Sequence, residues 1–316
     1  MRSVLIFVSF LLLTSLVHAT EFGIGSELET DELADQAATL GVTWVRLTFD
    51  WFQIEPQRGS FNWDTADQQV ERAQNRRLKI CAILNGTPKW ANGGHSTQTP
   101  PRDAQDWIDF VTAVVSRYRS SQTIGAYEIW NEPNLDRFWK GKQREYIDKI
   151  LIPGARAVRS ADPNALVIAP AFSNQWIFQS DWPLREVVRV AGDQIDIVSV
   201  HYYPDAHVPF GEYLDRWIGT SRLEKPVWIT EIGELGCSGK KGWLNQQSQN
   251  YENFLQAISE RSDWITNVFP YRLWDPRDQC DKNGNGYGLT AGDPPVERPA
   301  FQTYKDFIAK HRAAEP

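Results

Sequence analysis

Two glutamates stand near the ends of apolar runs, where carboxyl groups can do acid–base chemistry. Glu132 lies in Tyr-Glu-Ile-Trp-Asn-Glu-Pro-Asn (127–134), and Glu231 ends Val-Trp-Ile-Thr-Glu (227–231). A protonated carboxyl can give its proton to a leaving oxygen, while an ionised carboxylate attacks or stabilises an electron-poor carbon. Two facing carboxyls with these roles are what cleavage of a glycosidic bond requires. We therefore predict Glu132 as general acid/base and Glu231 as nucleophile.

The elements that must position these glutamates form a repeating pattern. Short β-rich runs alternate with segments of helical period, eight times along the chain, which predicts a single-domain (β/α)8 TIM barrel. A doubly wound open sheet is disfavoured because no Gly-x-Gly-x-x-Gly turn follows the first run. The expected strands are 22–26, 43–50, 78–84, 124–131, 165–169, 195–202, 227–232 and 267–274. The expected helices include 32–40, 63–76, 104–118, 144–159 and 246–261, with Thr30 and Asp103 as N-caps.

The barrel prediction brings the two glutamates together. In this fold the chemistry lies at the C-terminal ends of the strands, so Glu132 after the fourth run and Glu231 on the seventh share one rim. Glu128 is a rival acid, but four residues at about 3.3 Å each place it roughly 13 Å deeper. We expect Glu128 to form a structural ion pair inside the barrel.

The residues around Glu132 resemble a known signature. Glu128-Ile-Trp-Asn-Glu-Pro-Asn-Leu135, followed by Phe138-Trp139-Lys140, is similar to the acid/base motif of glycoside hydrolase family 39, one of a clan of barrel glycosidases that retain configuration. The resemblance implies Glu132 as acid/base, Asn131 as a contact of the sugar 2-hydroxyl and Glu231 as nucleophile. At the level of the clan it also implies site roles for four further residues: Arg46, His201, Tyr203 and Trp274.

The two carboxyls are expected to differ in protonation. Arg46 and Tyr203 would hold Glu231 ionised by hydrogen bonds from opposite sides, which predicts a lowered pKa for Glu231. Partial burial and the negative charge of Glu231 would raise the pKa of Glu132 and keep it protonated for the first step. The mechanism needs no cofactor and no metal.

Aromatic residues at the rim suit a glycan cleft. Four tryptophans follow or end strand runs on the catalytic side, and indole faces pack well against pyranose rings: Trp51, Trp90, Trp139 and Trp274. Trp44 and Trp228 are predicted to be core residues. The substrate would be a polysaccharide or oligosaccharide, and the many rim aromatics and short chain end favour endo cutting of a bacterial exopolysaccharide or plant-type glycan.

Two alternatives stay open at this point. A family 5-like endo-β-glucanase would use the same residues equally well, and the Phe138-Trp139 extension favours family 39 over it. Outside the enzymes, a non-catalytic glycan-binding barrel would keep the cleft without using the carboxylates. Retention of both glutamates argues against that binding-only interpretation.

Composition limits the partners and the compartment. The net charge of −7, without a Lys/Arg run, excludes a nucleic-acid partner, and we expect a monomer. Residues 1–19 read as a signal peptide, leaving 20–316 as the barrel domain of a secreted or periplasmic protein. The apolar run Val4–Val17 is too short for the roughly 20 residues of a membrane span.

Cysteines and one acidic loop give two further expectations. Cys237 and Cys280 lie in Gly-rich loop sequence and are predicted to form a disulfide, whereas Cys81 reads as a buried apolar residue. The run Asp281-Lys-Asn283-Gly-Asn285-Gly286 copies the first half of a calcium-binding EF-hand loop. Gly292 stands where the loop needs Glu, so a turn-rich loop is favoured over a calcium site.

Overall fold

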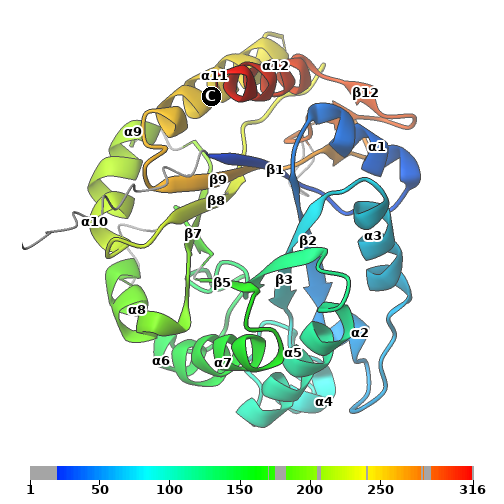
Figure 1. Ribbon diagram of the computed structural model, residues 1–316, viewed down its shortest axis with the longest axis vertical. Coiled ribbons are helices and arrows are strands. Elements are labelled where there is room, and N and C mark those ends of the chain that lie inside the picture. Colours follow the sequence, from blue (N-terminus) through cyan, green and yellow to red (C-terminus); the bar gives the residue numbers. More distant parts are fainter. Residues whose placement is uncertain are drawn as a thin grey trace, which may run out of the picture.

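The computed structural model describes residues 20–169, 171–174, 183–204, 208–239, 241–278, 280 and 286–314. Within them the strands form a closed ring surrounded by helices (Figure 1), which confirms the (β/α)8 barrel. The predicted signal peptide (residues 1–19) and residues 281–285 of the calcium-like loop lie outside the described residues. No helix among the described residues is long and apolar enough to cross a membrane.

The barrel sheet is parallel throughout and runs in the order β5-β4-β3-β2-β1-β9-β8-β7-β6. A parallel bridge between Ile168 and Ile197 closes the ring, and β5 and β6 are two parts of the fifth barrel strand. The barrel strands are β1 (Glu21–Gly25), β2 (Trp44–Asp50), β3 (Lys79–Asn85), β4 (Ile124–Ile129), β5 (Leu166–Ile168), β6 (Phe172–Ser173), β7 (Val198–Tyr202), β8 (Val227–Ile232) and β9 (Ile265–Pro270).

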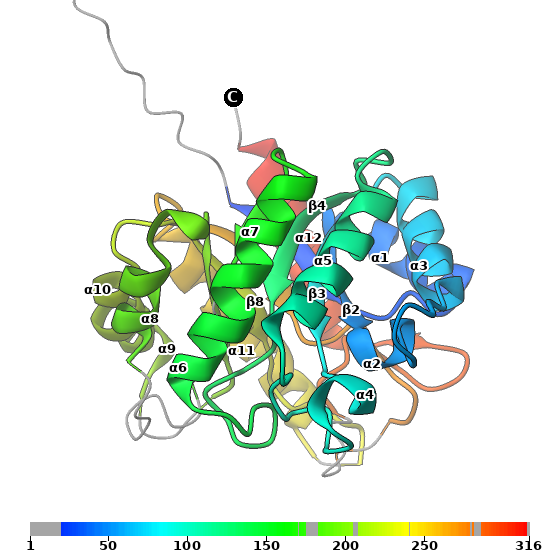
Figure 2. The same cartoon turned by 90° about the horizontal axis from the view of Figure 1, so that it is seen from below.

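Helices cover the outside of this ring, and α5 and α7 lie side by side along it (Figure 2). Each large helix buries an apolar stripe against the strands, as the helical period of the sequence predicted. The helical segments are α1 (Asp31–Leu40), α2 (Trp51–Ile54), α3 (Asp64–Asn75), α4 (Lys89–Asn92), α5 (Ala104–Tyr118), α6 (Gln143–Tyr146), η1 (Ile147–Leu151), α7 (Ile152–Ala161), α8 (Leu184–Ala191), η2 (Gly192–Gln194), α9 (Phe210–Glu212), η3 (Tyr213–Ile218), α10 (Gly219–Ser221), α11 (Trp243–Ser259) and α12 (Pro299–Ala313).

Helix ends follow local side-chain chemistry. The Thr30 hydroxyl accepts a hydrogen bond from the Leu33 amide, and the Asp103 carboxylate accepts one from Gln105. Both residues therefore cap their helices as predicted, because each satisfies an amide that has no partner inside the helix. Gly41 ends α1 in the left-handed conformation, with φ of 82°, which a residue without a Cβ adopts at little cost.

The N-terminal end of the barrel is filled by a compact aromatic cluster. Trp44 and Trp228 are both buried, and their rings meet edge to face at 4.9 Å, which confirms them as core residues. Cys81 is buried in the same cluster, also as predicted. Gly125 leaves the space for Trp44, since a Cβ there would lie 2.7 Å from the ring. This end is closed by packing, so the open end is the C-terminal rim.

The eighth expected strand was placed too far along the chain. Its barrel part, β9, ends at Pro270, and Trp274 belongs to β10 (Trp274–Asp275), which pairs with β11 (Thr290–Ala291) beside β12 (Val296–Glu297). Pro270 has no N–H for the sheet and ends the strand. The predicted disulfide between Cys237 and Cys280 is present and joins the loop after β8 to the segment after β10.

Candidate active site

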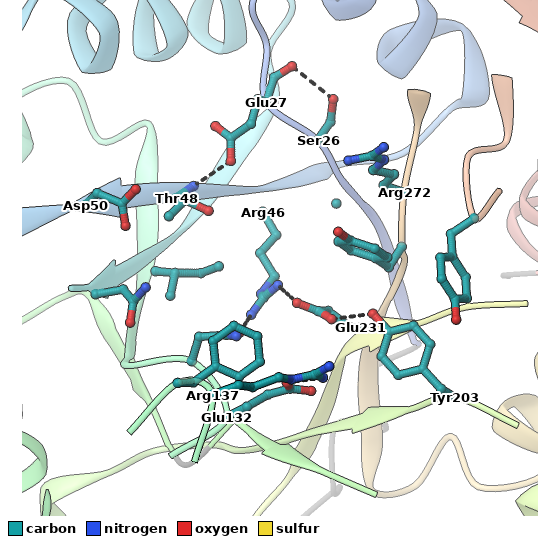
Figure 3. A pocket seen from close by; sticks show the side chains of 17 residues that line it. Ser26, Glu27, Arg46, Thr48, Asp50, Glu132, Arg137, Tyr203, Glu231 and Arg272 are labelled. Carbon is teal, nitrogen blue, oxygen red and sulfur yellow. Dashed lines mark hydrogen bonds and ion pairs between the residues drawn. The ribbon is translucent and has the colours of Figure 1, made fainter. Parts of the chain in front are cut away.

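A cavity of about 580 Å³ opens at the C-terminal rim, and Glu132 and Glu231 both line it. Arg46, Asn131 and Tyr203 are also in its wall (Figure 3), while His201 is fully buried directly behind the two carboxylates. The structure thus brings together six of the residues that the sequence singled out. They come from β2, the turn after β4, the end of β7 and β8.

Glu231 is held on β8 from two sides. Arg46 Nη1 lies 2.6 Å from its Oε1, and the Tyr203 hydroxyl donates to its Oε2. Burial and the negative charge of Glu231 raise the pKa of Tyr203 well above its ordinary value, so Tyr203 remains a donor. Two charge-assisted hydrogen bonds fix both oxygens and leave little freedom to rotate.

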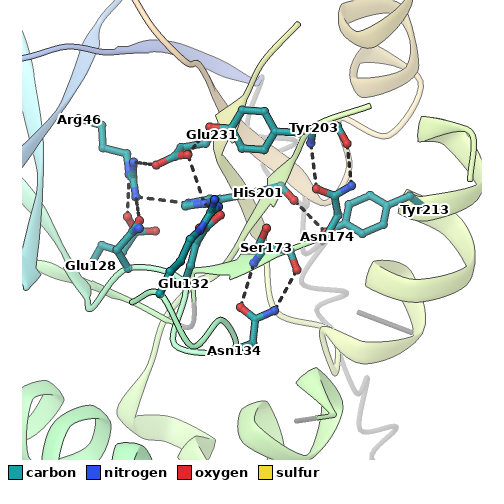
Figure 4. A network of polar contacts seen from close by, with 12 residues as sticks. Arg46, Glu128, Glu132, Asn134, Ser173, Asn174, His201, Tyr203, Tyr213 and Glu231 are labelled. Carbon is teal, nitrogen blue, oxygen red and sulfur yellow. Dashed lines mark hydrogen bonds and ion pairs between the residues drawn. The ribbon is translucent and has the colours of Figure 1, made fainter. Parts of the chain in front are cut away.

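Arg46 is the centre of the buried network drawn in Figure 4. Its Nε lies 2.7 Å from Glu128 Oε2, and its Nη2 lies 3.1 Å from Asn131 Oδ1 and 3.3 Å from His201 Nε2. Burial alone would lower the pKa of Arg46, but the charges of Glu128 and Glu231 outweigh burial and raise it. Glu128 therefore forms the structural ion pair that was predicted.

Glu132 lies just beyond β4, on a turn with unusual backbone. Trp130 and Glu132 have φ of 74° and 39°, in the left-handed region that non-glycine residues rarely adopt. The Glu132 amide donates to the Ala171 carbonyl at 3.0 Å, which anchors the turn on the fifth barrel strand. Backbone strain of this kind concentrates at functional sites, where the surrounding structure holds it in place.

Two asparagines fasten the loops around the site (Figure 4). Asn134, from the same motif as Glu132, exchanges two 3.1 Å hydrogen bonds with the backbone of Ser173. Asn174 does the same with Tyr203, at 2.7 and 2.9 Å. Each side chain ties two strand ends together, so the asparagines link the turn that carries Glu132, through β6, to the segment that carries Tyr203. Sequence reasoning left both in the background, although Asn134 belongs to the recognised motif.

The two oxygens of Glu132 have different partners. Oε1 lies 3.0 Å from His201 Nδ1, deep in the site, and Oε2 lies 3.1 Å from Arg137 Nη2. Burial raises the pKa of Glu132, but the hydrogen bond and charge of His201 and the charge of Arg137 outweigh burial and lower it. The expected raised pKa is therefore wrong, because the contacts of His201 and Arg137 with the Glu132 carboxylate were not foreseen.

The spacing of the two carboxylates distinguishes two kinds of glycosidic chemistry. One oxygen of Glu132 and one of Glu231 lie within 4.8 Å of each other. Carboxyls about 5 to 5.5 Å apart suit direct attack and retention, whereas about 6.5 to 9.5 Å leaves room for a water and gives inversion. So close an approach of the two carboxylates favours the retaining arrangement.

These two glutamates and His201 are also close enough to hold a metal ion. Arg46 and Arg137, however, already place two positive groups against the same carboxylates. A dication would have to displace or face both guanidinium groups, so the charge arrangement favours a metal-free site.

The expected role of the rim tryptophans needs correction. Trp51 and Trp139 have exposed fractions of 0% and 1%, and they pack in the core against Trp107, Trp130 and their neighbours. Trp90 and Trp274 are half-buried and are not among the residues that line the cavity. Sugar contacts at Trp90 and Trp274 stay a prediction for parts of a glycan outside the cavity.

Other aromatic residues take the place of those tryptophans. Tyr271 follows the end of β9 and lines the cavity, as do Phe138 and Tyr287. Tyr203, Tyr271 and Tyr287 pack against one another with ring centroids 5.3 to 6.0 Å apart. Tyr271 occupies the strand-end position that was assigned to Trp274. Pro270, which ends the strand, is the sequence feature from which Tyr271 could have been predicted as the strand-end residue.

The far end of the cavity is acidic. Glu27, which accepts from the Thr48 amide at 3.3 Å, and Asp50 lie on the side of Arg46 away from Glu132 (Figure 3). Enclosure by the cavity walls raises the pKa of both carboxyls, although hydrogen bonds from Thr48 and Gln53 act in the opposite direction. Sequence reasoning did not identify this pair, whose oxygens can accept hydrogen bonds from sugar hydroxyls.

Comparisons with known proteins identify the family and support the fold. A family model described as Cellulase (glycosyl hydrolase family 5) matches residues 14–269. A β-xylosidase of Geobacillus stearothermophilus is 40% identical over 143 residues, which cover 42% of this chain and 27% of that protein. An endo-1,4-β-xylanase of Agaricus bisporus is 24% identical over 325 residues, 93% of each chain.

A solved structure supports the fold over nearly the whole chain. A family 39 β-xylosidase from Caulobacter crescentus superposes with a TM-score of 0.71 at 20% identity, covering 93% of this chain and 72% of that one. The matched segments span less than a third of the length of the first curated relatives, two β-xylosidases. The likeness to the solved structure therefore concerns the barrel itself.

Proposed function

Because this chain belongs to the cellulase family, glycosyl hydrolase family 5, we propose that it is a retaining β-glycosidase that cleaves polysaccharides or oligosaccharides. The observation that carries the proposal is the approach of the Glu132 and Glu231 carboxylates to within 4.8 Å on the turn after β4 and on β8. This spacing lets one carboxylate reach the anomeric carbon while the other reaches the leaving oxygen.

In the first step Glu231 attacks the anomeric carbon and forms a glycosyl ester, while the bond to the leaving oxygen breaks. Glu132 gives its proton to that oxygen, so the leaving sugar departs as a neutral alcohol. Arg46 and Tyr203 orient the Glu231 carboxylate from both sides. Asn131, held by Arg46, presents its amide N–H₂ for the sugar 2-hydroxyl.

In the second step Glu132 acts as the base. It takes a proton from a water molecule whose oxygen attacks the anomeric carbon, and the ester to Glu231 breaks. Two successive inversions at the same carbon give net retention. His201, 3.0 Å from Glu132 Oε1, keeps this carboxylate oriented through both steps.

The length of the cavity suits a chain-like substrate. Its walls include Glu27 and Asp50 on one side of Arg46 and Glu132 and Arg137 on the other side, with Glu231 next to Arg46. A glycan lying along this cavity would have sugars on both sides of the scissile bond, as endo cutting requires. Relatives named β-xylosidase and endo-1,4-β-xylanase make β-linked xylose chains the first substrates to test.

The experiment that tests the proposal uses 2-fluoro-glycoside inactivators of several sugars, followed by mass spectrometry of the intact protein and its peptides. A glycosyl adduct on Glu231, absent from Glu231→Gln, is the expected result. A glycosyl adduct on another residue would show that this residue, and not Glu231, is the nucleophile. A broad panel that leaves the folded protein unlabelled, together with tight glycan binding, would support the non-catalytic glycan-binding barrel instead.

We also propose export of the mature chain from Thr20 onward, since the signal-peptide pattern ends at Ala19. N-terminal sequencing of protein from the producing cells and their medium tests this. A mature protein that begins at Thr20 outside the cytoplasm supports export. A chain that retains Met1 and stays in the cell contradicts it.

A further inference from the structure

The leaving group of the proposed reaction can approach Glu132 from one side only. His201, with no exposed surface, holds Oε1 at 3.0 Å behind the cavity wall. The other oxygen, Oε2, lies 3.1 Å from Nη2 of Arg137, and both Glu132 and Arg137 line the cavity. A glycosidic oxygen that is to receive the proton must come within hydrogen-bond distance of Oε2. Arg137 therefore stands where the leaving sugar has to arrive.

Arg137 is placed so that it can move. Its side chain is 57% exposed, against 2% for Glu132, and its guanidinium lies 4.8 Å above the Phe138 ring. The hydrogen bond to Glu132 uses one of its five N–H donors. Arg46 in the same cavity is 4% exposed and contacts four side chains, so it has no comparable freedom.

The partner that replaces Glu132 should carry a negative charge. Once Glu132 is protonated, Arg137 no longer has an anionic partner at Oε2. A neutral hydroxyl would not restore that pairing, whereas a carboxylate accepts two parallel N–H bonds from the planar guanidinium. The opposite end of the cavity, with Glu27 and Asp50, would repel an anion. Arg272, which also lines the cavity, is paired with Asp275 at 3.1 Å.

We infer that Arg137 is a specificity-determining residue that exchanges Glu132 for a carboxylate on the leaving-group sugar, so that the preferred glycan carries a uronic-acid-type residue there. This inference rests on the proposed function for the direction of the leaving group. It names the chemical class of one sugar in the substrate and assigns Arg137 to the subsite beyond the scissile bond.

The exchange of Glu132 for a substrate carboxylate at Arg137 also favours the protonated form of Glu132. Removal of the Arg137 charge from Oε2 raises the pKa of Glu132, because a nearby cation favours the ionised carboxylate. A substrate with the matching carboxylate would therefore help to protonate the group that must act on it. The charged and titratable groups that face Glu132 are His201, Arg137, Glu231, Tyr203 and Tyr213.

The first test measures binding and needs no turnover. Saturation-transfer NMR titrations would compare methyl β-D-glucuronide with methyl β-D-glucoside on the whole protein, on Arg137→Met and on Arg144→Met. Arg144 is a matched control, an exposed arginine paired with Asp148 on the helical segment α6–η1. We expect the glucuronide to bind at least about tenfold more tightly, an advantage that R137M loses and R144M keeps.

Equal affinity for the two glycosides would overturn the inference, and so would a preference that survives in R137M. Arg137→Lys keeps the charge without the planar fork, so it should retain only part of the preference. These outcomes are decided by binding alone. If no 2-fluoro-glycoside adduct forms on Glu231, the proposed retaining mechanism is wrong. The binding comparison does not depend on that adduct and would still decide the role of Arg137.

A second measurement places the carboxylate beyond the scissile bond. Enzyme labelled at Glu231 by a 2-fluoro sugar is reactivated when an acceptor binds in the leaving-group subsite. Methyl β-D-glucuronide should reactivate it about tenfold faster than methyl β-D-glucoside, and R137M should remove the difference. Equal reactivation by both acceptors, with the label in place, would contradict the assignment of Arg137 to that subsite.

Discussion

The surroundings of Glu231 and Glu132 differ in how firmly their arginines are held. Arg46 is buried, touches four side chains and keeps Glu231 between itself and Tyr203. Arg137 is more than half exposed and has one hydrogen bond to Glu132. A nucleophile must keep one charge and one orientation, whereas an acid/base must change its protonation state twice. A fixed partner suits the first task and a removable partner suits the second.

Replacing Glu231, whose arginine partner is firmly held, should have the largest effect on activity. Glu231→Gln should lower kcat by a factor on the order of 10⁴ or more, because no other carboxylate can form the covalent intermediate. Steady-state rates on the substrate found by inactivator labelling would measure the loss. Glu224→Gln changes an exposed carboxyl just before β8 and should leave the rate unaltered. Comparable activity in E231Q and wild type would show that Glu231 is not the nucleophile.

Breaking the fixed arginine should affect stability as well as rate. Arg46→Met leaves Glu128 buried without its cation, which is expected to cost about 3–5 kcal/mol of unfolding free energy. Denaturant unfolding would measure this cost. The double variant with Glu128→Gln should recover part of it, because the unpaired buried charge is gone. If R46M unfolds at the wild-type midpoint, Arg46 is not the buried counter-charge described here.

Glu132→Gln separates acid catalysis from nucleophilic attack. The variant should lose about 10² to 10⁴ in kcat on natural glycosides, whose leaving alkoxide needs a proton. On an aryl glycoside with a dinitrophenolate leaving group, the first step should remain close to wild type, since that group leaves without protonation. Burst kinetics on both substrates would show the difference. An equal loss on both would argue that Glu132 has a structural role.

The movable arginine should have the smallest effect, visible in the pH profile. Arg137 lowers the pKa of Glu132, after the larger effects of burial and His201. Arg137→Met therefore raises that pKa, so the protonated acid persists to higher pH and the alkaline limb of kcat/KM moves upward. The same profile for Arg144→Met should coincide with wild type. A downward shift, or none, would show that the charge of Arg137 does not act on Glu132.

The family comparison shows how far a short motif can be interpreted. The residues around Glu132 resembled family 39 first and family 5 second, and the family model that matches is that of family 5. A family 39 structure nevertheless shares the barrel at a TM-score of 0.71. The two comparisons together support the clan of barrel glycosidases that the motif indicated, with likeness to family 39 as well as to family 5.

The sequence by itself determined the order of the barrel elements, the helix caps and the disulfide, because these follow from local periodicity, capping chemistry and cysteine context. It also placed Glu132 and Glu231 at one rim, since the ends of parallel strands meet there. The family resemblance added Arg46, Asn131, His201 and Tyr203 to that site.

Only the tertiary structure decided which rim residues face the cavity and how Glu132 is charged. Trp51 and Trp139 turn into the core, and Tyr271 takes the place expected of Trp274, because side-chain direction depends on where each strand ends. The lowered pKa of Glu132 depends on Arg137 and His201, which approach from the following loop and from β7. Such through-space contacts leave no periodic mark in a sequence.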